Sequence, residues 1–240
     1  MEKKVCILLI AAAMVSCVNA TLVSHYEFEG NWNNSVAGSF AGVLTGTGNT
    51  STIITDSERG LVADLTGTNS WVYVGYDTAL NSIATNQQFT ITAWVKSTAG
   101  ANWQQIFGRR TEWGIRMVEG KVQLFTAGGT LLGSTAINDG EWTHIAATYN
   151  GGTGQAVVYV NGVQDGASTI NTTLVSSLRA AIGGRSSTYS VADFIYTGYV
   201  DDVRVYNTSL SSTEISQLVP EPATLCLLGL GAMGLIRRKK

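Results

Sequence analysis

The chain has 240 residues, of which 13% are charged and 45% hydrophobic, and its formal net charge is −2 at pH 7. Nucleic-acid binding relies on basic surfaces, so this charge excludes nucleic acid as an expected partner. The 27 glycines and the few charges are typical of an exported β-protein with many turns.

The first twenty residues have the layout of a secretory signal peptide. Lys3 and Lys4 precede an apolar run at 5–15, and Ala20 ends a small-residue cleavage site. This order of segments predicts that signal peptidase removes residues 1–20. A lipoprotein interpretation stays open, because the residues before Cys17 are close to a lipoprotein motif and Cys17 would then carry the lipid.

Segments that alternate between apolar and polar residues follow through the middle of the chain. Residues 89–96, 142–149 and 155–160 each have this period of two, which predicts half-buried β-strands. In the opening strand, strict alternation places Val23 and His25 on the same face. Strands recur about every eight to twelve residues, a spacing that favours a sandwich or a barrel.

Turn and helix signals separate these strands. Asn161-Gly162 is a favoured two-residue hairpin turn, and Glu119-Gly120 joins two further strands in the same way,. Ser211 and Glu214 have the spacing of a capping box, which predicts one short helix that closes the domain. No other helix is expected.

The tail carries both prolines of the chain, in Pro220-Glu221-Pro222, followed by an uncharged segment at 223–236 and four cations at 237–240. Fourteen residues span about 21 Å as a helix, which is short for a bilayer core of about 30 Å. The cations would halt translocation on the cytoplasmic side. We expect transient insertion in the inner membrane and cleavage near the Pro-Glu-Pro, with a resident tail anchor as the alternative.

The segment between the two ends has a distinct composition. All three cysteines lie outside it, so a disulfide, a thiolate metal site and a cysteine nucleophile are excluded there. Nine Lys and Arg remain against fifteen Asp and Glu, a net charge of −6. A domain of this size does not need disulfides to be stable.

The tail resembles the bacterial PEP-CTERM sorting signal, with the Pro-Glu-Pro, the apolar helix and the basic stop in order. The resemblance implies export, recognition by an exosortase, and delivery to the cell surface or extracellular matrix of a Gram-negative-type bacterium. Such bacteria often make exopolysaccharide. Residues 219–240 are therefore predicted to be a sorting signal.

Residues 21–218 resemble the laminin G-like, concanavalin A-like lectin/glucanase domain. Five segments carry the resemblance: 22–31, 89–96, 141–151, 158–162 and 199–215. The resemblance implies an all-β fold, a two-sheet antiparallel jelly-roll sandwich with one short C-terminal helix. Lectins, glycosidases and structural domains share this fold, so function must be argued from the sites.

Glycoside hydrolysis requires two carboxylates that flank the scissile bond. The strand with three spaced acids that glucanases of this fold carry is absent, and Glu27 and Glu29 are the one i, i+2 pair of glutamates in an evident strand. His25 and His144 are the only histidines, and a packing role is expected for both. The catalytic set is therefore predicted to be empty, and the protein is not expected to be an enzyme.

Calcium is the cofactor that the resemblance implies. Many similar domains bind one structural Ca²⁺ between the opening segment and the last core strand, which here places Glu29, Asn31 and Asp201 as ligands. Carboxylate and carbonyl oxygens suit this ion. The alternative is that Asp201 caps a turn or pairs with an arginine.

Exposed aromatic side chains are the expected platforms for sugar rings. Trp103 and Trp113 lie in or beside loops and bracket Arg109, so these three residues are the candidate carbohydrate contacts. Packing at a sheet edge is the alternative for each tryptophan. Trp94 and Trp142 are expected in the core.

The expected function is that of a non-catalytic binding or adhesion module outside the cell, with extracellular polysaccharide or a surface protein as its partner. Signal peptidase and exosortase are the partners expected during export. A polysaccharide-active glycoside hydrolase and a purely structural matrix protein are the alternatives.

Overall fold

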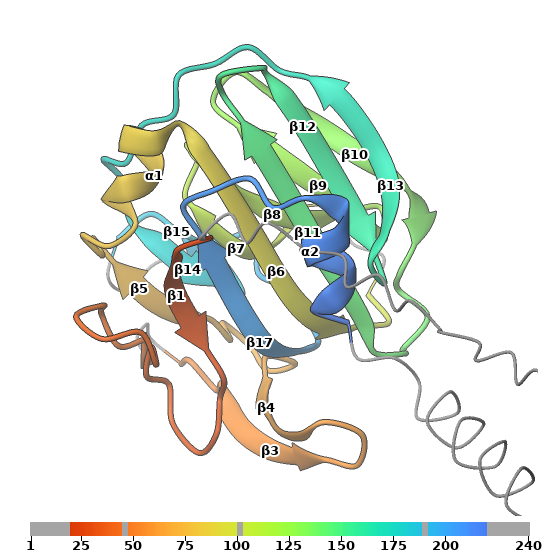
Figure 1. The fold of residues 1–240 in the computed structure, drawn as a ribbon. Coiled ribbons are helices and arrows are strands. Elements are labelled where there is room, and N and C mark those ends of the chain that lie inside the picture. Colours follow the sequence, from red (N-terminus) through yellow and green to blue (C-terminus); the bar gives the residue numbers. More distant parts are fainter. Residues whose placement is uncertain (1–19, 45–47, 100–102, 189–191, 220–240) are drawn as a thin grey trace, which may run out of the picture.

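Two antiparallel β-sheets lie face to face in the computed structural model, which describes residues 20–44, 48–99, 103–188 and 192–219 (Figure 1). The predicted fold class, an antiparallel two-sheet sandwich, is confirmed. The signal segment up to residue 19 and the processing residues Pro220, Glu221 and Pro222 lie outside the described residues.

The first sheet, sheet A, has eight strands in the order β13-β12-β11-β6-β17-β4-β3, and β1 pairs with β17 beside this path. Its strands are β1 (Leu22–Tyr26), β3 (Thr52–Asp56), β4 (Gly60–Asp64), β6 (Gln88–Lys96), β11 (Thr143–Asn150), β12 (Gln155–Val160), β13 (Val163–Thr169) and β17 (Tyr199–Tyr206). The alternating segments at 89–96, 142–149 and 155–160 form strands, as predicted, and these strands lie inside the sheet.

The second sheet, sheet B, has seven strands in the order β10-β9-β8-β7-β14-β5-β2. They are β2 (Val43–Leu44), β5 (Val72–Gly75), β7 (Gln104–Arg109), β8 (Trp113–Val118), β9 (Lys121–Thr126), β10 (Gly129–Ala136) and β14 (Ala180–Ile182). A small ribbon of β15 (Arg185–Ser186) and β16 (Ala192–Asp193) completes the strands of the described residues.

The core lies between the sheets and follows the alternation of each strand. In β6, Phe89 and Ile91 are fully buried against sheet B, and Thr90 between them faces the other side,. Trp94 and Trp142 were expected in the core, and this is wrong. Both are half-buried on the outer face of sheet A, because Trp94 alternates with the core positions of β6.

The predicted turns are confirmed by their backbone angles. Asn161 and Gly162 have φ values of 48° and 77°, and Glu119 and Gly120 have 53° and 74°. Positive φ at both central residues is what a two-residue hairpin turn of this type requires, and glycine and asparagine adopt it at least cost.

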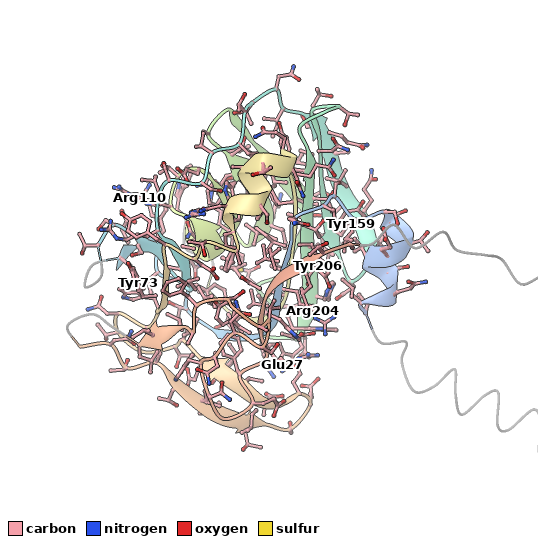
Figure 2. The ribbon with its side chains drawn as sticks, turned by 60° about the vertical axis from the view of Figure 1, so that its left-hand side comes forward. Glu27, Tyr73, Arg110, Tyr159, Arg204 and Tyr206 are labelled. Carbon is pink, nitrogen blue, oxygen red and sulfur yellow. The ribbon has the colours of Figure 1, made fainter. Side chains whose placement is uncertain are left out.

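The predicted closing helix is α2 (Ser212–Gln217), and both halves of the Ser211–Glu214 capping box are present. Its Ile215 is fully buried and covers one end of the outer face of sheet A, where Tyr159 and Tyr206 lie beside it (Figure 2). A second helix, α1 (Asn81–Asn86), was not expected. It has no side-chain cap and buries one residue, Ile83, so the sequence carries little signal for it,.

Among the described residues, no helix is long and apolar enough to cross a membrane. The apolar tail segment at 223–236 lies outside those residues.

Candidate functional site

The outer face of sheet B carries an exposed tryptophan. Trp103 directly precedes β7, has a left-handed backbone with φ 62°, and keeps 41% of its surface exposed. Beneath it lies Arg116 of β8, whose guanidinium carbon is 4.0 Å from the Trp103 ring centroid and 4.7 Å from that of Phe125. Arg116 faces outward because its neighbours Ile115 and Met117 point into the core,.

The row of contacting rings and guanidinium groups continues from Trp103 towards the small ribbon. The Phe194 ring is 5.5 Å from the Trp103 ring, and the Arg185 guanidinium lies 3.8 Å from the Phe194 centroid. Arg185 Nε donates to Asp193 Oδ1 at 2.6 Å. We call this row of Phe125, Arg116, Trp103, Phe194 and Arg185 the Trp103 stack.

The stack holds Trp103 in place from two sides. Each cation–ring contact contributes about 0.5–2 kcal/mol, more when it is desolvated. Gln105 N also donates to the Phe194 carbonyl at 2.8 Å, which ties the ribbon to β7. The result is an aromatic side chain that is held by its neighbours and still 41% exposed, an arrangement that suits stacking against a ligand.

Arg116 has an unusual electrostatic environment. It is 7% exposed, and burial together with the charge of Arg185 lowers its pKa to about 10. It therefore stays protonated at neutral pH. Its Nε donates to Gln123 Oε1 at 2.7 Å, a neutral partner.

Trp113 and Arg109 lie elsewhere. Trp113 begins β8 and faces the core with 0% exposure, its ring 5.5 Å from that of Phe89. Arg109 is 1% exposed, and its Nη1 donates to Asn81 Oδ1 at 2.9 Å. Neither side chain offers a surface to a ligand in this conformation, so Trp103 alone remains of the three candidate sugar contacts.

The sequence predictions did not include the other members of the Trp103 stack. Alternation along β8 places Arg116 on the face of the strand that points away from the core, whereas Trp113 points into it. The same rule places Phe125 and Gln123 outward on β9. That periodicity was the available signal. What it lacked was the pairing of β8 with β9, which brings Arg116 opposite Gln123.

The outer face of sheet A holds a second cation–aromatic cluster. The guanidinium of Arg59 lies between two rings, 4.2 Å from the Trp94 centroid and 5.6 Å from that of Trp142. Its Nε donates to Asp201 Oδ2 at 2.7 Å. Trp142 Nε1 donates to Asp56 Oδ1 at 3.0 Å, which fixes the second ring.

Of the three residues expected to bind calcium, Glu29 and Asp201 line one hollow of about 220 Å³, together with Glu27, Arg59 and Asp202. Asn31 does not line it. Its side-chain oxygen accepts from the Asn33 backbone at 2.8 Å and its amide donates to the Glu29 carbonyl at 3.3 Å.

Asp201 is already engaged on both oxygens. Oδ2 accepts from Arg59, and Oδ1 accepts from the Asp202 backbone N–H at 2.8 Å. Burial raises the pKa of Asp201 and Arg59 opposes this shift. No cluster of three or more His, Cys, Asp or Glu side chains able to hold a metal is found among the described residues. In this conformation the three residues do not fit a shared Ca²⁺.

His144 lies beside the Arg59 cluster and is 2% exposed, with its ring in edge contact with Trp94 at 5.3 Å. Burial lowers its pKa to about 4, with smaller effects from Asp202, Arg204 and Arg59. Its Nδ1 has no hydrogen-bond partner. His144 is therefore neutral at pH 7, which agrees with the packing role expected for it.

Replacing His144 by Phe is expected to remove part of the acid sensitivity of the fold. The unfolded chain protonates His144 near its ordinary pKa of 6.5 and the folded chain near 4, so the unfolded state binds more protons between these values. In the wild-type protein, the free energy of unfolding therefore keeps its full His144 contribution above about pH 6.5 and loses about 2 kcal/mol at pH 5. The Phe variant should lack this loss. Urea unfolding of both proteins at pH 7 and pH 5 measures the difference, and parallel pH profiles would contradict it.

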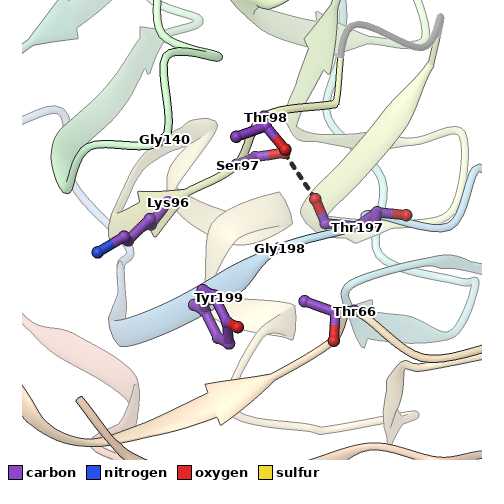
Figure 3. Close-up of a pocket in the computed structure, with 8 residues that line it drawn as sticks. All are labelled: Thr66, Lys96, Ser97, Thr98, Gly140, Thr197, Gly198 and Tyr199. Atoms are coloured by element: carbon purple, nitrogen blue, oxygen red, sulfur yellow. Dashed lines mark hydrogen bonds between the residues drawn. The ribbon is translucent and has the colours of Figure 1, made fainter.

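Two further hollows lie at the ends of the strands. One of about 200 Å³ is lined by Lys96, Thr98, Gly140 and Tyr199, and beside it Ser97 Oγ donates to the Thr197 carbonyl at 2.6 Å (Figure 3). The other, of about 350 Å³, lies near the β2 edge of sheet B. Its exposed aromatic residues are Phe40 and Tyr76.

The two antiparallel sheets that lie face to face define a jelly-roll sandwich domain. Residues 66–216 match the concanavalin A-like lectin/glucanases superfamily, and the chain belongs to this superfamily. Residues 218–240 match the PEP-CTERM protein-sorting motif, which indicates export and sorting to the cell surface or exterior. Both resemblances expected from the sequence are thereby confirmed.

Solved structures agree on the fold. Domain 4 of AbnA, a GH43 extracellular arabinanase from Geobacillus stearothermophilus in complex with arabinotriose, is 21% identical, with 84% of this chain and 99% of that chain covered and a TM-score of 0.65. The binding domain of Paraclostridial mosquitocidal protein 1 is 15% identical, with 82% and 51% covered and a TM-score of 0.63. The botulinum neurotoxin type G receptor-binding domain is 15% identical, with 83% and 51% covered and a TM-score of 0.61.

At these identities the likeness concerns the fold alone, and this chain spans about half the length of the two toxin domains. No curated protein matches the chain.

Proposed function

We propose that this protein is an exported, non-catalytic carbohydrate-binding module of the bacterial cell surface or extracellular matrix. The observation that carries the proposal is the Trp103 ring, which is 41% exposed and backed by Arg116 at 4.0 Å and Phe194 at 5.5 Å. Aromatic rings on rigid supports bind ligands with little loss of side-chain freedom. The arabinotriose bound to the similar AbnA domain supports a sugar as the ligand.

Proteolytic processing at both ends of the chain would deliver the domain to the cell surface or extracellular matrix. Signal peptidase would cut after Ala20, and an exosortase would act near Pro220-Glu221-Pro222 while the segment at 223–236 is inserted in the inner membrane. The sorting motif at 218–240 supports this route. The domain boundaries, the lipidation of Cys17 and the structural Ca²⁺ stay predictions, and a Ca²⁺ ion would have to compete with Arg59 for Asp201.

Replacing Trp103 by Ala is expected to weaken glycan binding at least tenfold, since stacking and desolvation at a central aromatic residue are worth 2 kcal/mol or more, on the order of hot-spot values. A glycan array followed by calorimetry on the purified protein measures the loss. The unfolding temperature should fall modestly, because the variant also loses the contacts of the ring with Arg116 and Phe194,, so binding is measured well below that temperature.

Tyr76→Ala is the matched control. Tyr76 has a similar exposure and its ring lies 4.7 Å from the Arg179 guanidinium, but it lines the hollow of about 350 Å³ near β2, away from the Trp103 stack. Loss of binding in Tyr76→Ala with Trp103→Ala unchanged would move the site to that hollow. If no glycan on the array binds, a purely structural role is favoured. If the protein binds a surface protein and no glycan, a protein partner is favoured.

A reducing-sugar assay on the glycans that bind separates the module from the glycoside hydrolase alternative. Turnover that is abolished by Glu27→Gln or Glu29→Gln would overturn the non-catalytic proposal. These two acids line the hollow beside Asp201 and Asp202.

A further inference from the structure

Arg116 is a buried cation without an anion. The chain has fifteen acidic residues outside its two end segments, and all of them lie within the described ranges. None of the ion pairs among those residues includes Arg116, whereas Arg185 is paired with Asp193. No carboxylate of the domain therefore compensates this charge.

The polar contacts of Arg116 are also incomplete. A guanidinium has five N–H donors, and here only Nε has a partner among the described residues, the side-chain oxygen of Gln123. Neither Nη group has a hydrogen-bond partner among those residues, and neither belongs to the fully enclosed side-chain nitrogens that lack a partner there. Burying a charged group without an opposite charge is costly, and ionisable groups in such environments cluster at functional sites.

The position of Arg116 limits the chemistry of that ligand. The Trp103 and Phe125 rings both pack against its guanidinium carbon, at 4.0 and 4.7 Å, and Nε is held by Gln123, so we take the Nη edge as the part left for an approaching group. A planar guanidinium edge matches a planar carboxylate through two parallel hydrogen bonds. Trp103 offers the adjoining ring face for a sugar.

We propose that Arg116 binds the carboxylate of a uronic acid residue, so that the ligand of the Trp103 stack is an acidic polysaccharide. This inference rests on the proposed carbohydrate-binding function and names its ligand class. Arg185 adds a second positive charge to the same surface, partly neutralised by Asp193. The stack is thus a basic spot on a domain whose net charge is −6.

The test compares each acidic glycan with its own carboxyl-reduced form, which keeps the sugar chain and removes the charge. Alginate, polygalacturonate and hyaluronate are suitable probes for calorimetry with the purified protein. We expect at least one acidic form to bind about tenfold or more tightly than its reduced form. This preference should shrink as salt is raised, because the ligand reaches the charge from solvent.

Two variants assign the preference to Arg116. Arg116→Gln removes the charge, and Gln123→Glu places a carboxylate of nearly the same shape on Arg116 Nε. Both should bind acidic and reduced forms alike. Gln123→Glu should also raise the unfolding temperature, so it remains informative if Arg116→Gln folds poorly. Asp165→Asn, which changes a carboxylate on β13 of sheet A, is the charge control and should keep the preference.

Equal binding of acidic and reduced forms by the wild-type protein, binding of neither form of any pair, or a preference that persists in both variants would each overturn the inference. If a sulfated glycan without uronic acid binds and none of the uronic-acid glycans does, the assignment of a carboxylate as the bound group is overturned. Trp103→Ala separates the two proposals. If the wild-type protein binds reduced and acidic glycans equally and Trp103→Ala abolishes this binding, the carbohydrate-binding function is supported and the acidic ligand class is contradicted.

Discussion

Replacing Arg109 by Met is expected to lower the free energy of unfolding by about 4 kcal/mol, the effect of removing one partner from a buried ion pair. Arg109 lies 3.9 Å from Glu112, and their side chains are 1% and 5% exposed. Glu112 in turn accepts hydrogen bonds from the Ser177 and Leu178 backbone N–H groups. The pair thereby fastens the segment before β14 to the turn between β7 and β8.

A second buried acid, Asp77, also gains from the charge of Arg109, although the backbone N–H groups of Ala79 and Phe40 contribute more. Burial raises the pKa of Asp77, and the charge of Arg109 opposes that rise. Arg109 Nε also donates to the Leu178 carbonyl, which would lose its partner. Methionine keeps the packing of the aliphatic stem and removes only the charge and the donors, so the variant isolates the electrostatic contribution.

Urea unfolding at pH 7 measures the effect of Arg109→Met, and Arg185→Met is the matched control. Arg185 pairs with Asp193, whose side chain is 51% exposed, so the ion pair should contribute about 0–1 kcal/mol, and the contact of Arg185 with the Phe194 ring adds about 0.5–1 kcal/mol. A cost below about 1 kcal/mol for Arg109→Met, combined with weaker glycan binding, would restore Arg109 as a ligand contact and contradict its structural role.

The strands and turns were predictable because they depend on local patterns. Alternation marked β6, β11 and β12, and positive φ at Asn161 and Gly162 follows from what those residues tolerate,. The capping box of α2 is equally local. These features need no knowledge of which strands become neighbours.

Which face of a strand becomes the core was less predictable. Trp94 and Trp113 both alternate with other large residues, yet Trp113 is in the core and Trp94 is outside. Alternation gives two faces, and the packing of one sheet on the other decides between them. The sequence alone could not assign Trp94 to the face that holds Arg59.

Irregularities in strand pairing caused a second class of errors. A register shift between Leu22 and Ser24 puts Val23 in the core while His25 lies outside and bonds Asp202. Strict alternation had placed Val23 and His25 on one face, and this prediction is wrong. A second shift, in β17, follows Asp201 and goes with a left-handed Asp202 at φ 50°. A bulge of this kind re-aims side chains.

The candidate sites depend on residues far apart in the chain. Arg59 meets Asp201 across 142 positions, and the Trp103 stack joins β8, β9 and the β15–β16 ribbon. No local pattern encodes these contacts. The sequence supplied one member of the stack, Trp103, because a tryptophan outside an alternating strand stands out, and it supplied Asp201 only through the family resemblance.

Replacing Arg59 by Met is expected to cost about 3 kcal/mol of unfolding free energy, because Asp201 is left buried without its cation. The value is at the lower end of the range for buried pairs since Arg59 keeps 18% side-chain exposure, against 7% for Asp201. The pKa of Asp201, already raised by burial, should rise further once Arg59 no longer opposes it. Chemical unfolding at pH 7 gives the cost.

The double variant Arg59→Met with Asp201→Asn should recover most of the loss, since it removes both charges together. Equal costs for the single and the double variant would show that Arg59 acts through its contacts with Trp94 and Trp142 instead.

The Arg59→Met variant also tests whether Asp201 binds calcium. Because Arg59 occupies Asp201 Oδ2, Ca²⁺ should raise the unfolding temperature of Arg59→Met more than that of the wild type, and EGTA should reverse the gain. An equal or larger Ca²⁺ effect in the wild type would mean that the ion binds beside Arg59, with Glu29 as a ligand and without displacing the guanidinium.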